Sequence, residues 1–323
     1  MEYVTPKIEL YRTRTFSEKL SDTFAFIREN WRPILKYFFY LMLPASIVLA
    51  FFMNHFMEMY MSFSMSMNKG GAFNDSDLVS LLLYLPGLII VSGLSYILLG
   101  ALVFTMVRLY RKREQRLKNL TTEEVKPELI FCLKRAALLT LAFFGILLVY
   151  ILLMGSIVAL GMVVNMALGF VFLLFVYFVT LVLVVPMSLV EPVYLLEDDI
   201  SVWGALKKGL RLGFKTFGGI LAVTFVIGLL ASVIQTVTSV PWYIMFVVKT
   251  VFLTAFEENS AFVNSFIYTV LQYISCVFEC LGMLLSSVIT TIGLVIQYGH
   301  AADKIDGVGV EENIAHFDEL DKF

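Results

Sequence analysis

The stretch AALLTLAFFGILLVYILLMGSIVALGMVVNMALGFVFLLFVYFVTLVLVVPMSLV, residues 136–190, holds no charged side chain in 55 consecutive positions. About 20 mainly apolar residues are enough for a helix to cross the roughly 30 Å hydrocarbon core of a bilayer. The stretch is therefore too long for one crossing, and Gly161 and Asn165 offer a turn near residues 160–165. It predicts a helical hairpin within a membrane.

The composition of the whole chain places it in the same class. Hydrophobic residues make up 59% of its 323 positions and charged residues only 15%, and the mean hydropathy is +0.84. A soluble core cannot hide that much apolar surface, so much of it must face lipid. The net charge of −2 does not favour a nucleic-acid partner, and the three cysteines do not indicate a disulfide framework.

Further apolar runs predict a bundle of six transmembrane helices. The runs are continuous and do not alternate in polarity, which favours helices over barrel strands, because lipid requires each backbone polar group to be satisfied within its own segment. The predicted spans are about 37–57, 80–105, 137–159, 166–190, 217–240 and 271–298. They form one all-α membrane domain over residues 1–300, followed by an acidic cytoplasmic tail over residues 301–323.

The positions of Lys and Arg predict the orientation. Of the 24 cations, 22 lie before the first span, between the second and third, between the fourth and fifth, or in the tail. The opposite side holds only Lys69 and Lys249. Since cytoplasmic loops carry the excess of Lys and Arg, we expect a multi-pass protein of the cytoplasmic membrane with both termini in the cytoplasm.

A basic amphipathic segment, SVWGALKKGLRLGFKTFGGIL at residues 201–221, precedes the fifth span. At 100° per residue its apolar side chains share one arc and its cations occupy the neighbouring arc. These cations are Lys207, Lys208, Arg211 and Lys215. We expect the segment to lie along the cytoplasmic interface, with its apolar side in the acyl boundary and its cations among anionic headgroups.

Similar amphipathic interfacial helices are expected before the first and third spans. Residues 16–31 carry apolar side chains at helical spacing, and Thr15 with Glu18 forms a capping box. Thr121 with Glu124 forms another ahead of the third span. An interfacial helix followed by a hairpin, repeated three times, would be an internal repeat. The alternative is that any interfacial helix shows this pattern.

A family resemblance covers the run VVPMSLVEPVYLLEDDISVWGALKKGLRLGFKTFGGIL, residues 184–221. It resembles the membrane domain of bacterial glycerophosphodiester phosphodiesterases and its stand-alone, uncharacterised six-span relatives. The matching positions are Pro186, Glu191, Ala205, Leu206, Lys207, Lys208, Leu210 and Phe217. The resemblance implies a multi-span membrane protein. It does not imply phosphodiesterase activity, which belongs to a separate soluble barrel in the fused enzymes.

The sixth span carries a polar face, with residues spaced by three, four or seven. Its members are Gln272, Ser275, Cys276, Glu279, Ser286 and Thr290, and Gln235 of the fifth span is an expected partner. Glu279 is the only charge deep in any predicted span, and an intramembrane carboxylate is by default a functional hypothesis. It is interpreted either as a proton- or ion-coupling site or as part of interhelical hydrogen bonding.

Three classes of function stay open on the sequence. No motif of a catalytic nucleophile, metalloprotease or nucleotide-binding loop occurs, so an enzyme is the least favoured class, and no metal or cofactor is predicted. The favoured class is a non-enzymatic protein that organises membrane lipids, through their anionic headgroups, or a protein partner or second copy of itself. The alternative is a small-solute or ion-coupled transporter that uses Glu279.

Overall fold

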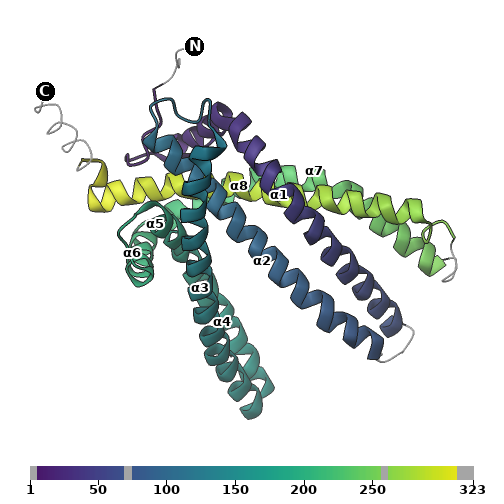
Figure 1. Cartoon of the computed structure of the whole chain (residues 1–323). Helices are drawn as coiled ribbons and strands as arrows, with labels where there is room; N and C mark the ends of the chain where they lie inside the picture. The colour runs from purple at the N-terminus through teal and green to yellow at the C-terminus, as the bar shows by residue number, and fades with distance from the viewer. Residues whose placement is uncertain (1–5, 69–74, 256–260, 311–323) are drawn as a thin grey trace, which may run out of the picture. The chain divides into compact units, whose positions relative to one another are not determined.

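The computed structural model describes residues 6–68, 75–255 and 261–310, and the chain is all-α there, with no strand among these residues (Figure 1). Its helices are α1 (Phe16–Asn68), α2 (Asp75–Lys112), α3 (Thr122–Val164), α4 (Met166–Met187), α5 (Val190–Leu196), α6 (Val202–Lys215), α7 (Phe217–Ala255) and α8 (Phe266–Asp306). Six helical stretches of the described chain are long and apolar enough to cross a membrane, with α4 and α5 counted together. The prediction of an all-α membrane protein with six spans is confirmed.

The helices extend beyond the predicted spans, because a helix continues through charged residues at which an apolar run stops. The observed stretches are Phe16–Ser64, Leu78–Lys112, Thr122–Val164, Met166–Leu196, Phe217–Leu253 and Phe266–Asp306, and each contains one predicted span. The last of them takes in the start of the predicted tail, since residues 301–306 belong to α8. Residues 311–323 of that tail lie outside the described residues.

The turn between α3 and α4 depends on Asn165, which lies inside the interval at which the sequence divides the apolar run. Its backbone is extended, with φ −163° and ψ 135°. Its N–H donates to the carbonyl of Gly161 at 2.9 Å, and its Oδ1 accepts from the N–H of Ala167 at 2.9 Å. One residue therefore ends α3 and caps α4, and the two helices lie side by side as a hairpin (Figure 1).

The chain forms two compact units. The first comprises residues 1–33, 100–227 and 290–323, and the second comprises residues 34–99 and 228–289. Helices α3 to α6 belong wholly to the first unit, whereas α1, α2, α7 and α8 contribute to both.

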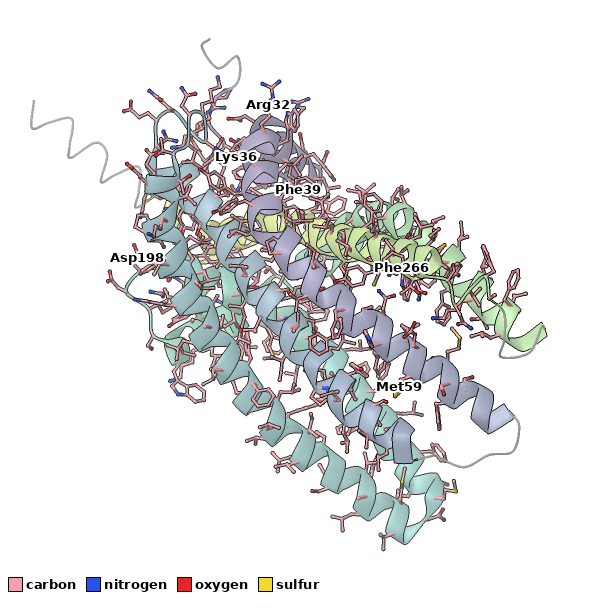
Figure 2. All side chains as sticks on the ribbon, turned by 45° about the vertical axis from the view of Figure 1, so that its right-hand side comes forward. Arg32, Lys36, Phe39, Met59, Asp198 and Phe266 are labelled. Atoms are coloured by element: carbon pink, nitrogen blue, oxygen red, sulfur yellow. The ribbon has the colours of Figure 1, made fainter. Side chains whose placement is uncertain are left out.

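A buried arginine organises the first unit. Arg108 of α2 is 5% exposed, and its guanidinium donates to Glu128 of α3, to Asp198 Oδ1 at 2.7 Å and to the carbonyl of Leu195 at 3.1 Å. Figure 2 labels Asp198 in the loop that follows α5. Because a buried guanidinium needs acceptors for its donors, this residue fixes α2, α3 and the end of α5 together.

Two glycines let α6 approach its neighbours closely. An added Cβ would lie 2.7 Å from Val190 Cα at Gly209 and 2.5 Å from Pro186 Cα at Gly213. Real Cβ atoms do not make such contacts, so only glycine allows the buried side of α6 to rest on the backbone of α4 and α5. Ala205 and Leu206 complete this buried side.

Gly209→Ala is expected to lower the free energy of unfolding by about 1–3 kcal/mol, since the added methyl overpacks the contact with Val190. Unfolding of the purified protein by sodium dodecyl sulfate in mixed micelles measures the change. Gly145→Ala is the control, because nothing lies within 4 Å of its added methyl. Equal effects of the two changes would contradict the close packing of α6.

Only one of the three expected amphipathic helices is separate from the span that follows it. Thr216 stands between α6 and α7. Residues 16–31 are instead the first turns of α1, which runs unbroken for 53 residues, and the segment after Thr121 is the start of α3. In α1 and α3 the helix continues without a break from the amphipathic residues into the span. Both expected capping boxes are present, whereas the threefold repeat stays a prediction.

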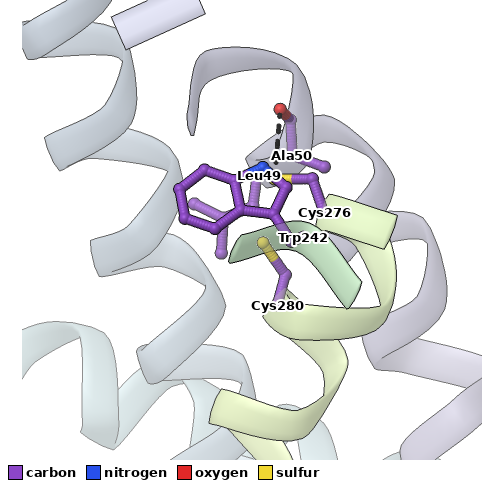
Figure 3. Close-up of a cluster of buried hydrophobic side chains, with 5 residues drawn as sticks. All are labelled: Leu49, Ala50, Trp242, Cys276 and Cys280. Carbon is purple, nitrogen blue, oxygen red and sulfur yellow. Dashed lines mark hydrogen bonds between the residues drawn. The ribbon is translucent and has the colours of Figure 1, made fainter. Parts of the chain in front are cut away.

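The second unit has a core around Trp242 of α7, which is 1% exposed (Figure 3). It packs with Leu49 and Ala50 of α1 and with Cys276 and Cys280 of α8. The core brings three helices together and lies beside the predicted polar face of α8.

Most of the apolar surface of the α3–α4 hairpin is not covered by protein. In each of the stretches Thr122–Val164 and Met166–Leu196, only 6% of the 18-residue apolar window is buried, whereas the share in α8 is 56%. Apolar side chains project from the exposed helix faces, among them Phe39 and Phe266 of the second unit (Figure 2). Exposed apolar surface of this extent requires lipid as its solvent.

Candidate functional site

The polar face of α8 in the second unit is buried around Glu279. This residue is 9% exposed, and its Oε2 atom has no hydrogen-bond partner among the described residues. Burying a carboxyl group without compensating hydrogen bonds is unfavourable. Structure alone does not account for a glutamate at this position, which makes Glu279 a candidate functional group.

Two other members of this face contact α1. The amide of Gln272 donates to Asn54 Oδ1 at 3.5 Å, and Cys276 Sγ donates to the carbonyl of Ala50 at 3.8 Å, the bond drawn in Figure 3. Asn54 Oδ1 also accepts from Trp242 Nε1 at 3.1 Å. Asn54 therefore joins α1, α7 and α8 by hydrogen bonds.

A second buried polar group, Ser46 of α1, belongs to the same unit as Glu279. The hydrogen bonds at Ala50 and Asn54 are one helical turn apart on α1, and their partners are one turn apart in the opposite direction on α8. The same register continued by one turn places Ser46 opposite Cys280, the residue that follows Glu279. Ser46 is fully buried, and its Oγ also lacks a partner within the described chain.

Glu279 Oε2 stays without a hydrogen-bond partner among the described residues, although Ser275 lies one helical turn away on α8. Ser275 is half-buried, and the Ser286 hydroxyl donates to the carbonyl of Met283 in its own helix at 2.8 Å. Thr290 belongs to the first unit. Gln235 is exposed and lines a hollow of about 610 Å³ that is bounded by residues of α7 alone. The expected pairing of Gln235 with Glu279 is therefore absent among the described contacts.

The basic segment predicted before the fifth span is α6, and two of its four cations hold ion pairs. Lys208 Nζ lies 2.8 Å from Glu197 Oε1, and Arg211 donates to both carboxylate oxygens of Asp306 at 2.7 Å. These acids neutralise half of the expected headgroup-facing charge. Lys207 and Lys215 are exposed, and no ion pair joins either one to another described residue.

The apolar residues of α6 lie on two faces and not on the single face that the sequence suggested. Leu206 is buried and Gly213 packs against the backbone of Pro186, whereas Trp203 and Phe214 are 69% and 50% exposed. The helical period alone could not separate the buried from the exposed apolar residues of α6. The difference arises because α4 and α5 cover only one side of the predicted apolar arc. The outer face thus presents two aromatic rings beside free lysines.

The sequence did not single out Asn54 and Ser46. Both are polar residues eight positions apart in an apolar run, which places them on one side of α1 and could have indicated a partner for the polar face of α8. The three cysteines are free and buried. No group of three or more His, Cys, Asp or Glu residues suited to a metal ion occurs in the described ranges.

These features define a multi-pass α-helical membrane protein whose described residues include a buried carboxyl group without a full set of partners, Glu279, and an exposed basic aromatic helix face on α6. Comparison of the chain with protein-family models, with curated proteins and with solved structures finds no match. The resemblance of residues 184–221 to the membrane domain of glycerophosphodiester phosphodiesterases stays a prediction.

Proposed function

We propose that the protein is a non-enzymatic component of the cytoplasmic membrane that organises anionic lipids, with both termini in the cytoplasm. The observation that carries this proposal is the outer face of α6. There Trp203 and Phe214 are exposed beside Lys207 and Lys215, which have no partner within the described chain. Aromatic rings favour the level of the headgroups, and lysines there attract anionic lipid.

The distribution of charge along the chain supports the same orientation. The exposed lysines of α6 lie on the side that holds 22 of the 24 Lys and Arg residues by the sequence assignment. The two ion pairs at Lys208 and Arg211 hold α6 against Glu197 and Asp306, so its outer face has a fixed orientation. A protein partner or a second copy of the chain is a further occupant that this face accommodates.

The double variant Lys207→Gln, Lys215→Gln is expected to bind dioleoyl phosphatidylglycerol about 30-fold more weakly, at about 1 kcal/mol per lysine. Native mass spectrometry of the full chain in neutral detergent, titrated with this lipid and with dioleoyl phosphatidylcholine, measures both affinities. The matched control is Lys69→Gln, Lys249→Gln, which removes two lysines from the opposite predicted side. A lipid preference that survives the first variant, or falls equally in the control, rejects the proposal.

A small-solute or ion-coupled transporter is the second candidate, and the unpartnered Glu279 Oε2 favours it. A buried carboxyl group that exchanges a proton would need no permanent partner. Glu279→Gln preserves shape and hydrogen-bonding capacity but cannot release a proton.

In proteoliposomes with an internal pH-sensitive dye, the unmodified chain should carry protons down an imposed pH gradient, and Glu279→Gln should reduce that rate at least about tenfold. Ser275→Ala is the control, because this hydroxyl lies on the same helix, one turn from Glu279. Equal rates with glutamate and glutamine would assign Glu279 to helix packing alone.

A further inference from the structure

The first turn of α7 is an exposed source of hydrogen-bond donors in the first unit. This helix begins at Phe217 and continues with Gly218 and Gly219. The first N–H groups of a helix have no acceptor inside it, and the aligned peptide dipoles make this end positive. The hydroxyl of the preceding Thr216 is committed elsewhere, since it donates to the carbonyl of Leu212 at 2.9 Å.

A buried ammonium group lies beside this turn. Lys19 of α1 is 5% exposed, and no hydrogen bond or ion pair joins its ammonium group to a described residue. Its Nζ lies 3.5 Å from the position that a Cβ of Gly219 would occupy. The charged groups that act on it most strongly are Lys304 and Arg14, and both carry the same sign. A buried charge without a counterion is strongly unfavourable.

A buried amide completes the cluster. Gln297 of α8 is 0% exposed, and neither its Nε2 nor its Oε1 has a hydrogen-bond partner. Its Nε2 lies 3.2 Å from the same Cβ position on Gly219. A buried amide without hydrogen-bond partners is unfavourable, so the retention of Gln297 at this point indicates a missing partner.

The carboxylates near this cluster are engaged by other groups. Asp22 accepts from Arg14 Nε at 2.7 Å, and Asp303 accepts from the N–H of Gly309 at 3.0 Å. His300 Nδ1 accepts from the N–H of Arg14 at 2.9 Å, so its neutral ring carries a hydrogen on Nε2. The cluster therefore presents hydrogen-bond donors and positive charge. Because the nearby carboxylates bind other groups, Lys19 has no counterion among the described residues.

We propose that Lys19, Gln297 and the first turn of α7 form a binding site for a phosphate group. A helix N-terminus with bare glycines allows a phosphate to approach the backbone N–H groups. Lysine supplies the compensating charge, and the glutamine amide supplies a directed donor. The phosphate belongs either to a phospholipid headgroup or to a small soluble phosphate. This site uses none of the α6 residues proposed to bind lipid.

Thermal unfolding of the full chain in neutral detergent tests the site. Two probes are added at matched ionic strength: potassium phosphate against potassium chloride, and dioleoyl phosphatidate against dioleoyl glycerol. At least one phosphate-bearing probe should raise the Tm by about 5 °C near saturation. A response to soluble phosphate identifies a free ligand, and a response to phosphatidate alone identifies a lipid headgroup. No response to either probe overturns the proposal.

Matched variants separate a binding role from a structural one. Lys19→Met and Gln297→Leu should abolish the shift, and Lys126→Met, which removes an exposed lysine of α3, should keep it. Gly219→Ala should abolish it because its methyl fills the site, whereas Gly218→Ala, whose methyl meets nothing within 4 Å, should keep it. Without phosphate, Lys19→Met should unfold no earlier than the unmodified chain. Retention of the full shift in Lys19→Met and Gln297→Leu would overturn the assignment.

Discussion

Replacing Arg108 with methionine is expected to lower the free energy of unfolding by about 3–5 kcal/mol. The change removes the donors to Glu128, Asp198 and the Leu195 carbonyl at once. Glu128 would stay mostly buried, with Lys112 as its remaining ion-pair partner at 3.0 Å. The loss is large because the acceptors are left without their donor, and the ion pair itself contributes less than that.

Unfolding by sodium dodecyl sulfate in mixed micelles measures this loss. Arg28→Met is the control, because Arg28 is exposed and its loss should change stability by no more than about 0.5 kcal/mol. Arg108→Lys should recover only part of the stability, since an ammonium cannot reproduce the planar fork of donors. If Arg108→Met and Arg28→Met unfold alike, Arg108 does not organise the first unit.

Trp242→Ala is the change expected to have the largest effect in the second unit, a loss of about 3–5 kcal/mol. Trp242 is 1% exposed, and its removal leaves a cavity between Ala50 of α1 and Cys276 of α8 (Figure 3). It also removes the donor to Asn54 Oδ1. Both losses fall on the contact that holds α1, α7 and α8 together.

The same unfolding measurement applies to this variant, with Trp203→Ala as the matched control. Trp203 is 69% exposed, so its truncation creates no cavity. Trp242→Phe should lie between the two, because it keeps most of the ring volume but loses the hydrogen bond. A Trp242→Ala protein as stable as Trp203→Ala would show that the cluster in Figure 3 does not stabilise the unit.

The spans were predictable because their signal is local. A charge-free run long enough to cross a bilayer must become a helix in lipid, whatever surrounds it. The break near residues 160–165 was also predictable, since Asn165 supplies both a backbone break and a cap. The extent of α1 was not, because an amphipathic segment and a transmembrane segment share the same helical period and nothing in the period marks a boundary.

The candidate sites depend on contacts between residues far apart in the chain, and the sequence shows these least. The partner of Arg211 is Asp306, 95 residues away, so a cation expected to face headgroups is instead paired. Gln235 and Glu279 share the second unit, but Gln235 is exposed and Glu279 Oε2 has no hydrogen-bond partner among the described residues. The convergence of Lys19 with Gln297 at Gly219 was missed. Two glycines at the start of a predicted helix were the one local sign of it.

The bare surface of the α3–α4 hairpin has a consequence for where the protein can reside. The charge-free part of α3, residues 136–164, runs about 43 Å at 1.5 Å per residue, which exceeds the roughly 30 Å of hydrocarbon in an average bilayer. Only 6% of the most apolar 18-residue window of α3 is buried within the described chain, so the extra apolar length faces lipid. The hairpin must therefore tilt, or the acyl chains around it must stretch. The free-energy cost of this hydrophobic mismatch depends on bilayer thickness. The protein should therefore partition into the thicker regions of a mixed membrane.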